Sequence, residues 1–252
     1  MSNIIHAYCE HHLGDNIINF IFFYKIKKYI ESNNIIIHYY CHQQYHKNIL
    51  DFNCSENIKI FNYEKTGFHL WMANNHLWMA NIHNRYFIED ILFQLFKDFF
   101  SLNNIPLTID TFEYQDNDLF KRFFYLEDTY KNLDILIINS HPCSGQYHYD
   151  KNIWDNFIVK LSNKYKLATS EKVNDEIISL HDFSVKNIAA IALNVKIIIT
   201  INTGPSVPLY NTDILNNVDV IYMFDTAGYK FKTRKIKAMR NIEDLSFLLE
   251  DK

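Results

Sequence analysis

The chain has 252 residues and a formal net charge of −4, with 48% hydrophobic and 21% charged residues. This length can bury one large core or two modest ones, and the composition is that of a folded globular protein. The negative charge balance argues against a general nucleic-acid binder. Asparagine and isoleucine are used so heavily that single residues of either type carry little information.

The four cysteines, at positions 9, 41, 54 and 143, are far apart and form no CxxC pair. This spacing predicts free, buried thiols in a reducing compartment. The N-terminus lacks the basic region and apolar core of a signal peptide. The longest apolar run, Ile17 to Tyr24, is too short to span a bilayer. We therefore expect a cytoplasmic protein with no transmembrane segment, for which peripheral membrane contact stays open.

The first 64 residues alternate between strand and helix patterns. The run at 35–40 is continuously apolar, as in a parallel sheet that is covered on both faces. Gly14 and Asp15 form a tight turn between the first strand and the first helix. The order βαβαβ with short loops is half of a doubly wound domain. The predicted strands are 3–8, 35–40 and 58–61, and the predicted helices are 15–31 and 43–51.

The sequence His-Leu-Trp-Met-Ala-Asn at 69–74 is repeated at 76–81. A period of seven puts Trp71 and Trp78 on nearly one face if the stretch is helical, and on opposite faces if it is a strand. One interpretation is an aromatic wall for a sugar acceptor. The other is a small tandem duplication whose tryptophans lie in the core.

A Phe-rich amphipathic helix at 85–101 precedes a polar stretch at 102–130, where we expect the first domain to end. The domains are thus predicted as 1–130 and 131–252. The last segment, 241–252, reads as a helix capped by Asn241, and it could return to brace the first domain. The second series contains strands at 133–139, 166–169, 195–201 and 218–224, and helices at 151–165 and 184–193.

The loop Asn202-Thr203-Gly204-Pro205-Ser206 follows a buried strand and opens a helix. Gly204 would let the backbone approach a ligand, the amides of the first turn carry partial positive charge, and Thr203 and Ser206 add hydroxyl groups. Such a loop suits a diphosphate. An ordinary turn with Pro at the first helical position fits the same residues.

Asp15 is open to two interpretations in the same way. As a helix cap it would contribute about 0.5–2 kcal/mol, and as a general base it would take a proton from a substrate. A helix dipole lowers the pKa of such a carboxyl group, so Asp15 would be a weak base unless domain closure desolvates it.

Other polar clusters give weaker signals. The residues His141, Cys143, His148 and Asp150 match no common zinc spacing. His42 and His46 lie one helical turn apart and could chelate a metal, but they read as part of a solvated helix face. We therefore expect no metal site. A basic run between 230 and 240 also reads as a solvated face, with phosphate contact as the alternative; its members are Lys230, Lys232, Arg234, Lys235, Lys237 and Arg240.

Taken together, these motifs resemble a glycosyltransferase group that includes the bacterial heptosyltransferases, the glycosyltransferase family 9-like group. There, a Gly-Asp turn opens the first helix, a Lys and a Trp start a later helix, a Ser-Leu pair precedes another helix, and a strand ends in an Asp-Ser/Thr-Gly-Pro-like loop. The matching residues here are Gly14-Asp15, Lys151 with Trp154, Ser179-Leu180 with Asp182, and Asn202 to Ser206.

The resemblance implies an α/β, GT-B architecture, in which two Rossmann-like domains face a cleft. It implies an inverting, metal-independent glycosyltransferase that uses a nucleotide-sugar as co-substrate and no cofactor. Asp15 would be the base, Lys151 and residues 202–206 would bind the donor diphosphate, and Asp182 would lie on the nucleoside side. His12, Gly14, Trp71 and Trp78 would lie on the side of the glycan or other hydroxyl acceptor. The alternatives are a nucleotide-sugar epimerase or hydrolase, and a non-catalytic nucleotide- or glycan-binding protein.

Overall fold

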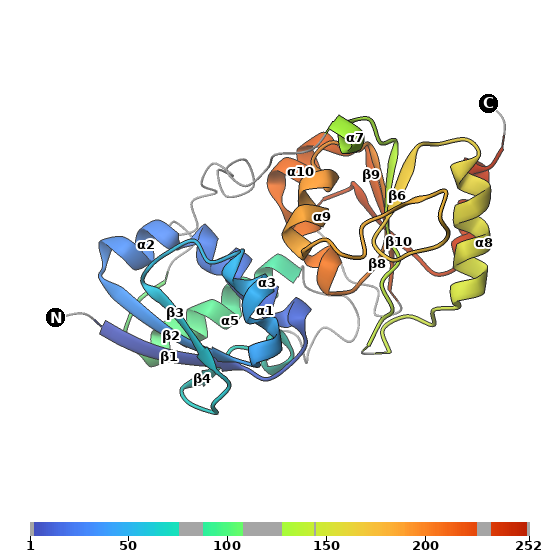
Figure 1. Ribbon diagram of the computed structural model, residues 1–252. Helices are drawn as coiled ribbons and strands as arrows, with labels where there is room; N and C mark the ends of the chain where they lie inside the picture. Colours follow the sequence, from blue (N-terminus) through green and yellow to red (C-terminus); the bar gives the residue numbers. More distant parts are fainter. Residues whose placement is uncertain (1–2, 76–87, 108–127, 144, 226–232, 251–252) are drawn as a thin grey trace. The chain divides into compact units, whose positions relative to one another are not determined.

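The computed structural model describes residues 3–75, 88–107, 128–143, 145–225 and 233–250. These residues form two compact α/β units, the first containing the described residues up to 107 and the second those from 128 onward (Figure 1). Each unit has its own parallel sheet, as the sequence predicts. The boundary at residue 130 stays a prediction, because the segment before 128 lies outside the described residues.

The first unit is built on a four-stranded parallel sheet with the order β3-β2-β1-β4. Its strands are β1 (Asn3–Cys9), β2 (Ile35–Cys41), β3 (Ile58–Asn62) and β4 (Phe68–His69), and its helices are α1 (Leu13–Lys25), α2 (Lys27–Ser32), η1 (Gln43–Tyr45), α3 (His46–Leu50), η2 (Met72–Asn74) and α5 (Ile88–Leu102). The helix predicted over 15–31 is divided at Ile26, whose φ of −112° leaves the helical range.

One face of this sheet carries the core of the first unit. Phe20 and Phe23 of α1 pack edge-on against Tyr39 of β2, and Phe96 of α5 stacks on Phe22. Burial alternates along β2, so that its odd-numbered residues are buried and its even-numbered ones only half-buried. The prediction of a strand covered on both faces is therefore wrong: β2 has the period-2 pattern of a strand buried on one face.

The second unit has a six-stranded parallel sheet with the order β10-β9-β8-β5-β6-β7. The strands are β5 (Ile135–Ile138), β6 (Leu167–Thr169), β7 (Ile178–Ser179), β8 (Ile197–Ile201), β9 (Val220–Phe224) and β10 (Ile236–Met239), and the helices are α7 (Asp128–Lys131), α8 (Lys151–Ser162), α9 (Val185–Ala192), η5 (Gly204–Tyr210), α10 (Thr212–Asn217) and η6 (Ile242–Leu248). In Figure 1, α8 covers one face of this sheet and α9 and α10 lie on the other.

The C-terminal segment packs within the second unit. Ile242, Leu245 and Leu248 of η6 belong to the same buried cluster as Trp154 and Phe157 of α8. The apolar face of η6 is thus covered by α8 within the second unit, and contact of this segment with the first domain stays a prediction. The predicted cap is confirmed: Asn241 and Asp244 form a capping box at the start of η6.

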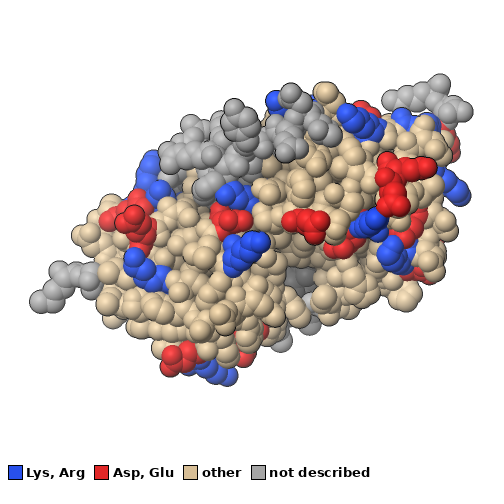
Figure 2. Space-filling model, viewed as in Figure 1, with Lys and Arg blue, Asp and Glu red and all other residues tan. Residues whose placement is uncertain are grey.

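The surface of the second unit includes an apolar side chain of α8 and most of the predicted basic run. Ile153 is 44% exposed. Arg234, Lys237 and Arg240 are exposed, as expected of a solvated face. The basic run contains strand β10, which pairs with β9, and Lys235 donates to the carbonyl oxygens of Asn216 and Val218. Lys230 and Lys232 lie outside the described residues. Figure 2 shows acidic and basic side chains interspersed on the visible face of the molecule.

The described helices are all too short or too polar to cross a membrane. The cytoplasmic location and any peripheral membrane contact stay predictions.

Cys9 and Cys41 are free and buried, as predicted, whereas Cys143 is free but exposed.

Candidate functional site

The first cluster of polar residues lies where the strand order of the first sheet changes direction. From β1 the chain proceeds to β2 and then β3 on one side, and β4 pairs with β1 on the other side. Ligands of open parallel sheets bind at the carboxyl ends of the strands at such a switch point. The segments that leave β1 and β4 there are residues 10–15 and 70–74. They are held together by a hydrogen bond from the Leu70 amide to the Tyr8 carbonyl, 2.8 Å long.

Asp15 lies in the first turn of α1, whose N-cap is His12. Its carboxylate accepts hydrogen bonds from the His12 backbone amide and from the Trp71 side chain. Gly14 is therefore a helical residue, and the tight turn expected at Gly14 is replaced by the extended backbone of His12, with φ −66° and ψ 166°.

The electrostatic expectation for Asp15 is also wrong in sign. Burial raises the pKa of the Asp15 carboxyl group, although the neighbouring His11 and His12 and the two hydrogen bonds act in the opposite direction. Desolvation therefore outweighs the favourable end of the helix.

A buried polar network fixes the geometry around Asp15. The Tyr39 hydroxyl donates to Asn16 Oδ1 over 2.8 Å, and Asn19 Nδ2 donates to the Tyr39 hydroxyl and to the Leu70 carbonyl, each over 2.9 Å. The Asn16 amide also donates to the carbonyl oxygens of His11 and His12. These contacts tie α1, β2 and the segment after β4 together.

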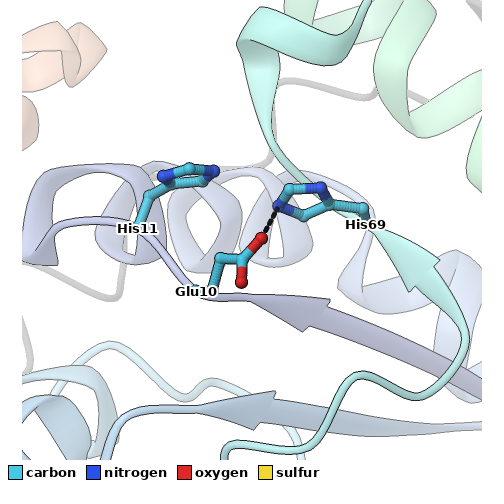
Figure 3. Close-up of side chains that lie close together, drawn as sticks. All are labelled: Glu10, His11 and His69. Carbon is cyan, nitrogen blue, oxygen red and sulfur yellow. Dashed lines mark ion pairs between the residues drawn. The ribbon is translucent and has the colours of Figure 1, made fainter.

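A second group of side chains surrounds the end of β4 (Figure 3). The Glu10 Oε1 atom lies 3.9 Å from His69 Nε2, and Glu10 Oε2 accepts a hydrogen bond of 2.7 Å from the Tyr63 hydroxyl. The His11 ring stacks on Trp71 with centroids 3.7 Å apart and lies 5.2 Å from the His69 ring. Burial lowers the pKa of both histidines, and the Tyr63 hydrogen bond lowers the pKa of Glu10.

A hollow of about 360 Å³ adjoins these residues on the side of β2. It is lined by Glu10, His11 and His12 from the segment after β1, and by residues 42–45 from the segment after β2. His12 is exposed. The predicted acceptor-side residues His12, Gly14 and Trp71 thus lie in neighbouring segments of the first unit, whereas Trp78 lies outside the described residues.

The second sheet has its own switch point, between β5 and β8. The chain leaves β5 toward β6 and β7, and it leaves β8 toward β9 and β10. The two segments that start at these carboxyl ends are in contact, because Gln146 Nε2 donates to the Asn202 carbonyl over 2.6 Å. Asn202, Thr203, Gly204, Pro205 and Ser206 therefore lie where the rule for parallel sheets places a ligand.

Within this loop, both predicted hydroxyl donors bond inside the protein. The Thr203 hydroxyl donates to the Ile201 carbonyl over 3.3 Å. Ser206 is fully buried, its hydroxyl donates to the Thr203 carbonyl over 2.7 Å, and it accepts the Thr203 amide over 3.1 Å. Ser206 thus shapes the loop as part of a capping box instead of presenting a hydroxyl group. The helix that follows is a 3₁₀ helix of seven residues. Asn202 Nδ2 donates to the buried carboxylate of Asp225, a residue that belongs to none of the motifs in the sequence.

The remaining predicted donor-side residues lie on neighbouring segments. Lys151 is the first residue of α8 and forms an ion pair with Asp155. Asp182 follows β7, is exposed, and lies with its Oδ2 atom 3.0 Å from His181 Nε2. Lys151, Asp182 and Asn202 all lie in segments that follow the carboxyl ends of strands of the second sheet. Ser170 and Glu171, after β6, join this edge through hydrogen bonds to Asn139.

The histidine pair considered as a chelate is engaged elsewhere. The Nε2 atom of His42 lies 3.1 Å from the Glu10 carbonyl oxygen, and that of His46 lies 3.3 Å from the Cys41 carbonyl oxygen. Each ring therefore fixes a turn after a strand. The three potential ligands that do converge among the described residues are Glu10, His11 and His69.

Comparisons with known proteins identify the fold. No family model and no curated sequence matches the chain. Among solved structures, the E. coli heptosyltransferase WaaC with ADP-2-deoxy-2-fluoro heptose matches with a TM-score of 0.58 and 8% identity, over 94% of this chain and 93% of that one. A family 9 glycosyl transferase from Veillonella parvula matches with a TM-score of 0.53 and 12% identity, over 97% and 88%.

The chain shares the GT-B-type fold of these glycosyltransferases. The iron-containing dodecameric glycosyltransferase TibC from enterotoxigenic E. coli also matches, with a TM-score of 0.52 and 8% identity over 94% of this chain and 62% of that one. The predicted α/β class and the predicted structural resemblance to the heptosyltransferase group are confirmed at the level of fold.

Proposed function

We propose that the protein is an inverting, metal-independent glycosyltransferase that moves a sugar from a nucleotide-sugar to a hydroxyl group of a glycan or other acceptor. The observation that carries this proposal is the position of Asp15. It is a carboxylate with a raised pKa at the switch point of the first sheet. The shared fold with known glycosyltransferases supports the reaction class.

In the proposed reaction, Asp15 accepts the proton of the acceptor hydroxyl while the acceptor oxygen attacks the anomeric carbon. The bond from that carbon to the donor diphosphate breaks, and its electron pair leaves with the nucleoside diphosphate. One displacement of this kind inverts the anomeric centre. A raised pKa suits the role of Asp15, because a general base works best when its pKa approaches the working pH.

The leaving diphosphate gains negative charge, which the second unit would stabilise. Lys151 would supply a positive charge, and the Gly204 backbone amide a hydrogen-bond donor. The amides of Asn202, Thr203 and Ser206 already have partners within the second unit. Asp182 would contact the nucleoside, and His12, Gly14 and Trp71 would contact the acceptor. These roles require the switch-point edges of the two units to face the same substrates, which is itself part of the proposal.

A thermal-shift screen against nucleoside diphosphates and nucleotide-sugars tests the donor site, because a ligand that binds only the folded state raises the melting temperature. ADP-sugars come first, since the structure of WaaC is one with ADP-2-deoxy-2-fluoro heptose. No shift with any nucleotide would contradict the proposal.

The base assignment needs the Asp15→Asn variant. It should abolish transfer while donor affinity stays within a few-fold of wild type, and Asp175→Asn, an exposed carboxylate of the second unit, should transfer normally. Product analysis separates the alternatives: a hydrolase releases free sugar, an epimerase returns an altered donor, and a binding protein gives neither. Near-wild-type transfer by Asp15→Asn would rule out Asp15 as the base.

A further inference from the structure

Three ligating side chains converge beside the candidate base. Glu10 and His11 follow β1, and His69 ends the neighbouring strand β4 (Figure 3). One potential ligand atom from each residue lies within 4.8 Å of the other two. Parallel pairing of β1 with β4, in the register Tyr8 to His69, brings together residues that are almost sixty positions apart in the sequence.

Two of these ligand atoms lack partners in the part of the chain that the structure describes. The Nε2 atoms of His11 and His69 are buried and make no hydrogen bond there. The contact of 3.9 Å from His69 Nε2 to Glu10 Oε1 is too long to be one. Burying an unsatisfied polar atom costs about 1–3 kcal/mol. Two such atoms beside one carboxylate indicate that something else binds between them.

We propose that Glu10, His11 and His69 bind a zinc ion through the Glu10 carboxylate and the Nε2 atoms of the two histidines. Two imidazoles and one carboxylate form a common zinc ligand set, with a fourth position left for water. Bonds of about 2.0–2.2 Å to zinc place tetrahedral ligand atoms roughly 3.3 Å apart. The ligand atoms must therefore close by up to about 1.5 Å. Stacking on Trp71 leaves the edge of the His11 ring available for this movement.

The surrounding groups suit such an ion. The Tyr63 hydroxyl holds the second oxygen of Glu10, and the side-chain amide of Asn74 lies 2.7 Å from His69 Nδ1. Rotating that amide presents its oxygen to Nδ1–H, which leaves Nε2 as the metal ligand, the usual arrangement around zinc-bound histidine.

The zinc ion has no part in the proposed transfer and would oppose it. His11 and Asp15 are close enough to affect each other's ionisation. A divalent cation at His11 would lower the pKa of Asp15 and make it a weaker base. TibC is named as iron-containing, but at 8% identity its metal says nothing about these three side chains.

Isothermal titration of the full chain with Zn²⁺ tests the site without any substrate. We expect one tight site per chain. His69→Ala and His11→Ala should each weaken it by more than the roughly 10–100-fold that is typical of losing an outer-sphere partner. His181→Ala is the matched control, because it removes a histidine that is paired with a carboxylate, Asp182, and has no third converging ligand among the described residues. It should bind Zn²⁺ like wild type.

X-ray absorption at the zinc edge gives an independent measurement, with nitrogen and oxygen neighbours only and no sulfur from the free cysteines. Melting curves recorded without zinc show whether each variant is folded. If a histidine variant does not fold, Glu10→Gln is titrated with Zn²⁺ in its place. Equal affinity in wild type, His69→Ala and Glu10→Gln would overturn the proposal, as would sulfur in the zinc shell. Because the readout is binding, failure here leaves the proposed transfer reaction untouched, and loss of transfer activity leaves the zinc site untouched.

Discussion

The side chain of Trp71 donates a hydrogen bond to the Asp15 carboxylate, and its ring stacks on His11 with centroids 3.7 Å apart. One indole thus contacts both the candidate base and a proposed zinc ligand. The segment that carries Trp71 is fixed at Leu70, whose amide and carbonyl groups bond to Tyr8 and Asn19. The position of Asp15 therefore depends on β4 as much as on its own helix.

Trp71→Phe should shift the pH profile of the proposed transfer reaction. The substitution keeps an aromatic ring on His11 but removes the N–H donor. That hydrogen bond favours the charged carboxylate, so its loss raises the pKa of Asp15 further. The acid limb of kcat/KM should move to higher pH. Trp71→Ala, which also removes the stack, should lower activity at every pH. An acid limb that stays in place for Trp71→Phe would contradict the hydrogen bond to Asp15.

Asp15→Asn should make the protein more stable at neutral pH. The folded-state pKa of Asp15 lies above its ordinary value of 3.8, so the folded state binds more protons than the unfolded state between these two values. Stability is therefore lost as the pH rises through this window, at about 1.4 kcal/mol per unit of pKa shift. Asparagine avoids this loss and still offers an oxygen to the two donors.

Melting temperatures of wild type and Asp15→Asn across pH 3 to 8 check this prediction. The variant should melt higher at neutral pH, by about 2–4 °C for each kcal/mol, and the curves should converge at the acid end. Asp175→Asn removes an exposed carboxylate and should stay within about 0.5 kcal/mol of wild type. A variant less stable than wild type at pH 7 would show that burial does not disfavour the charged form of Asp15.

Tyr39→Phe should destabilise the first unit by roughly 1–3 kcal/mol, because it leaves Asn16 Oδ1 and Asn19 Nδ2 short of a buried partner. Urea unfolding should show a lower midpoint with an unchanged slope. The control is Tyr40→Phe on the half-buried face of the same strand, where the hydroxyl contacts only His6 Nδ1 in the described network. Its cost should be about 0.5 kcal/mol or less. Equal costs for both variants would contradict the importance of the network.

Much of the fold could be predicted from the sequence, because long aliphatic strands and amphipathic helices have strong local patterns. The short strands β4 and β10 could not. β4 has two residues, too few for any periodicity, and the chain reaches it through Gly67, whose φ of +87° lies where other residues are strained. A side chain at Gly67 would also meet the His6 carbonyl oxygen at 2.1 Å. β10 lies within a basic run that resembled a solvated surface.

The site could be predicted only in part. Asp15 and Trp71 stood out by residue type and context, but Glu10, His11 and His69 did not, because their proximity follows from the β1–β4 pairing and not from spacing in the sequence. Asn16 and Asn19 were hidden by the asparagine-rich composition. Their role depends on Tyr39 lying opposite them on β2, a tertiary contact with no local signal.

Asn202→Asp should destabilise the second unit, although it restores the acid found in the resembled glycosyltransferase loop. Asn202 donates to the buried carboxylate of Asp225, so an aspartate here would replace a donor with a second negative charge. Losing a hydrogen bond to a charged group costs roughly 1.5–3 kcal/mol. Like charges also raise the carboxyl pKa of the pair, so this variant should lose stability as the pH rises from 5 to 8.

The double variant N202D/D225N reverses the pair and is the decisive control. It restores one amide opposite one carboxylate, so it should recover more than half of the stability lost in Asn202→Asp and remove its extra pH dependence. Urea unfolding at pH 5 and pH 8 measures both effects. If the double variant is no more stable than Asn202→Asp, the two positions are not coupled. The presence of asparagine at position 202 would then have to be explained by something other than its contact with the Asp225 carboxylate.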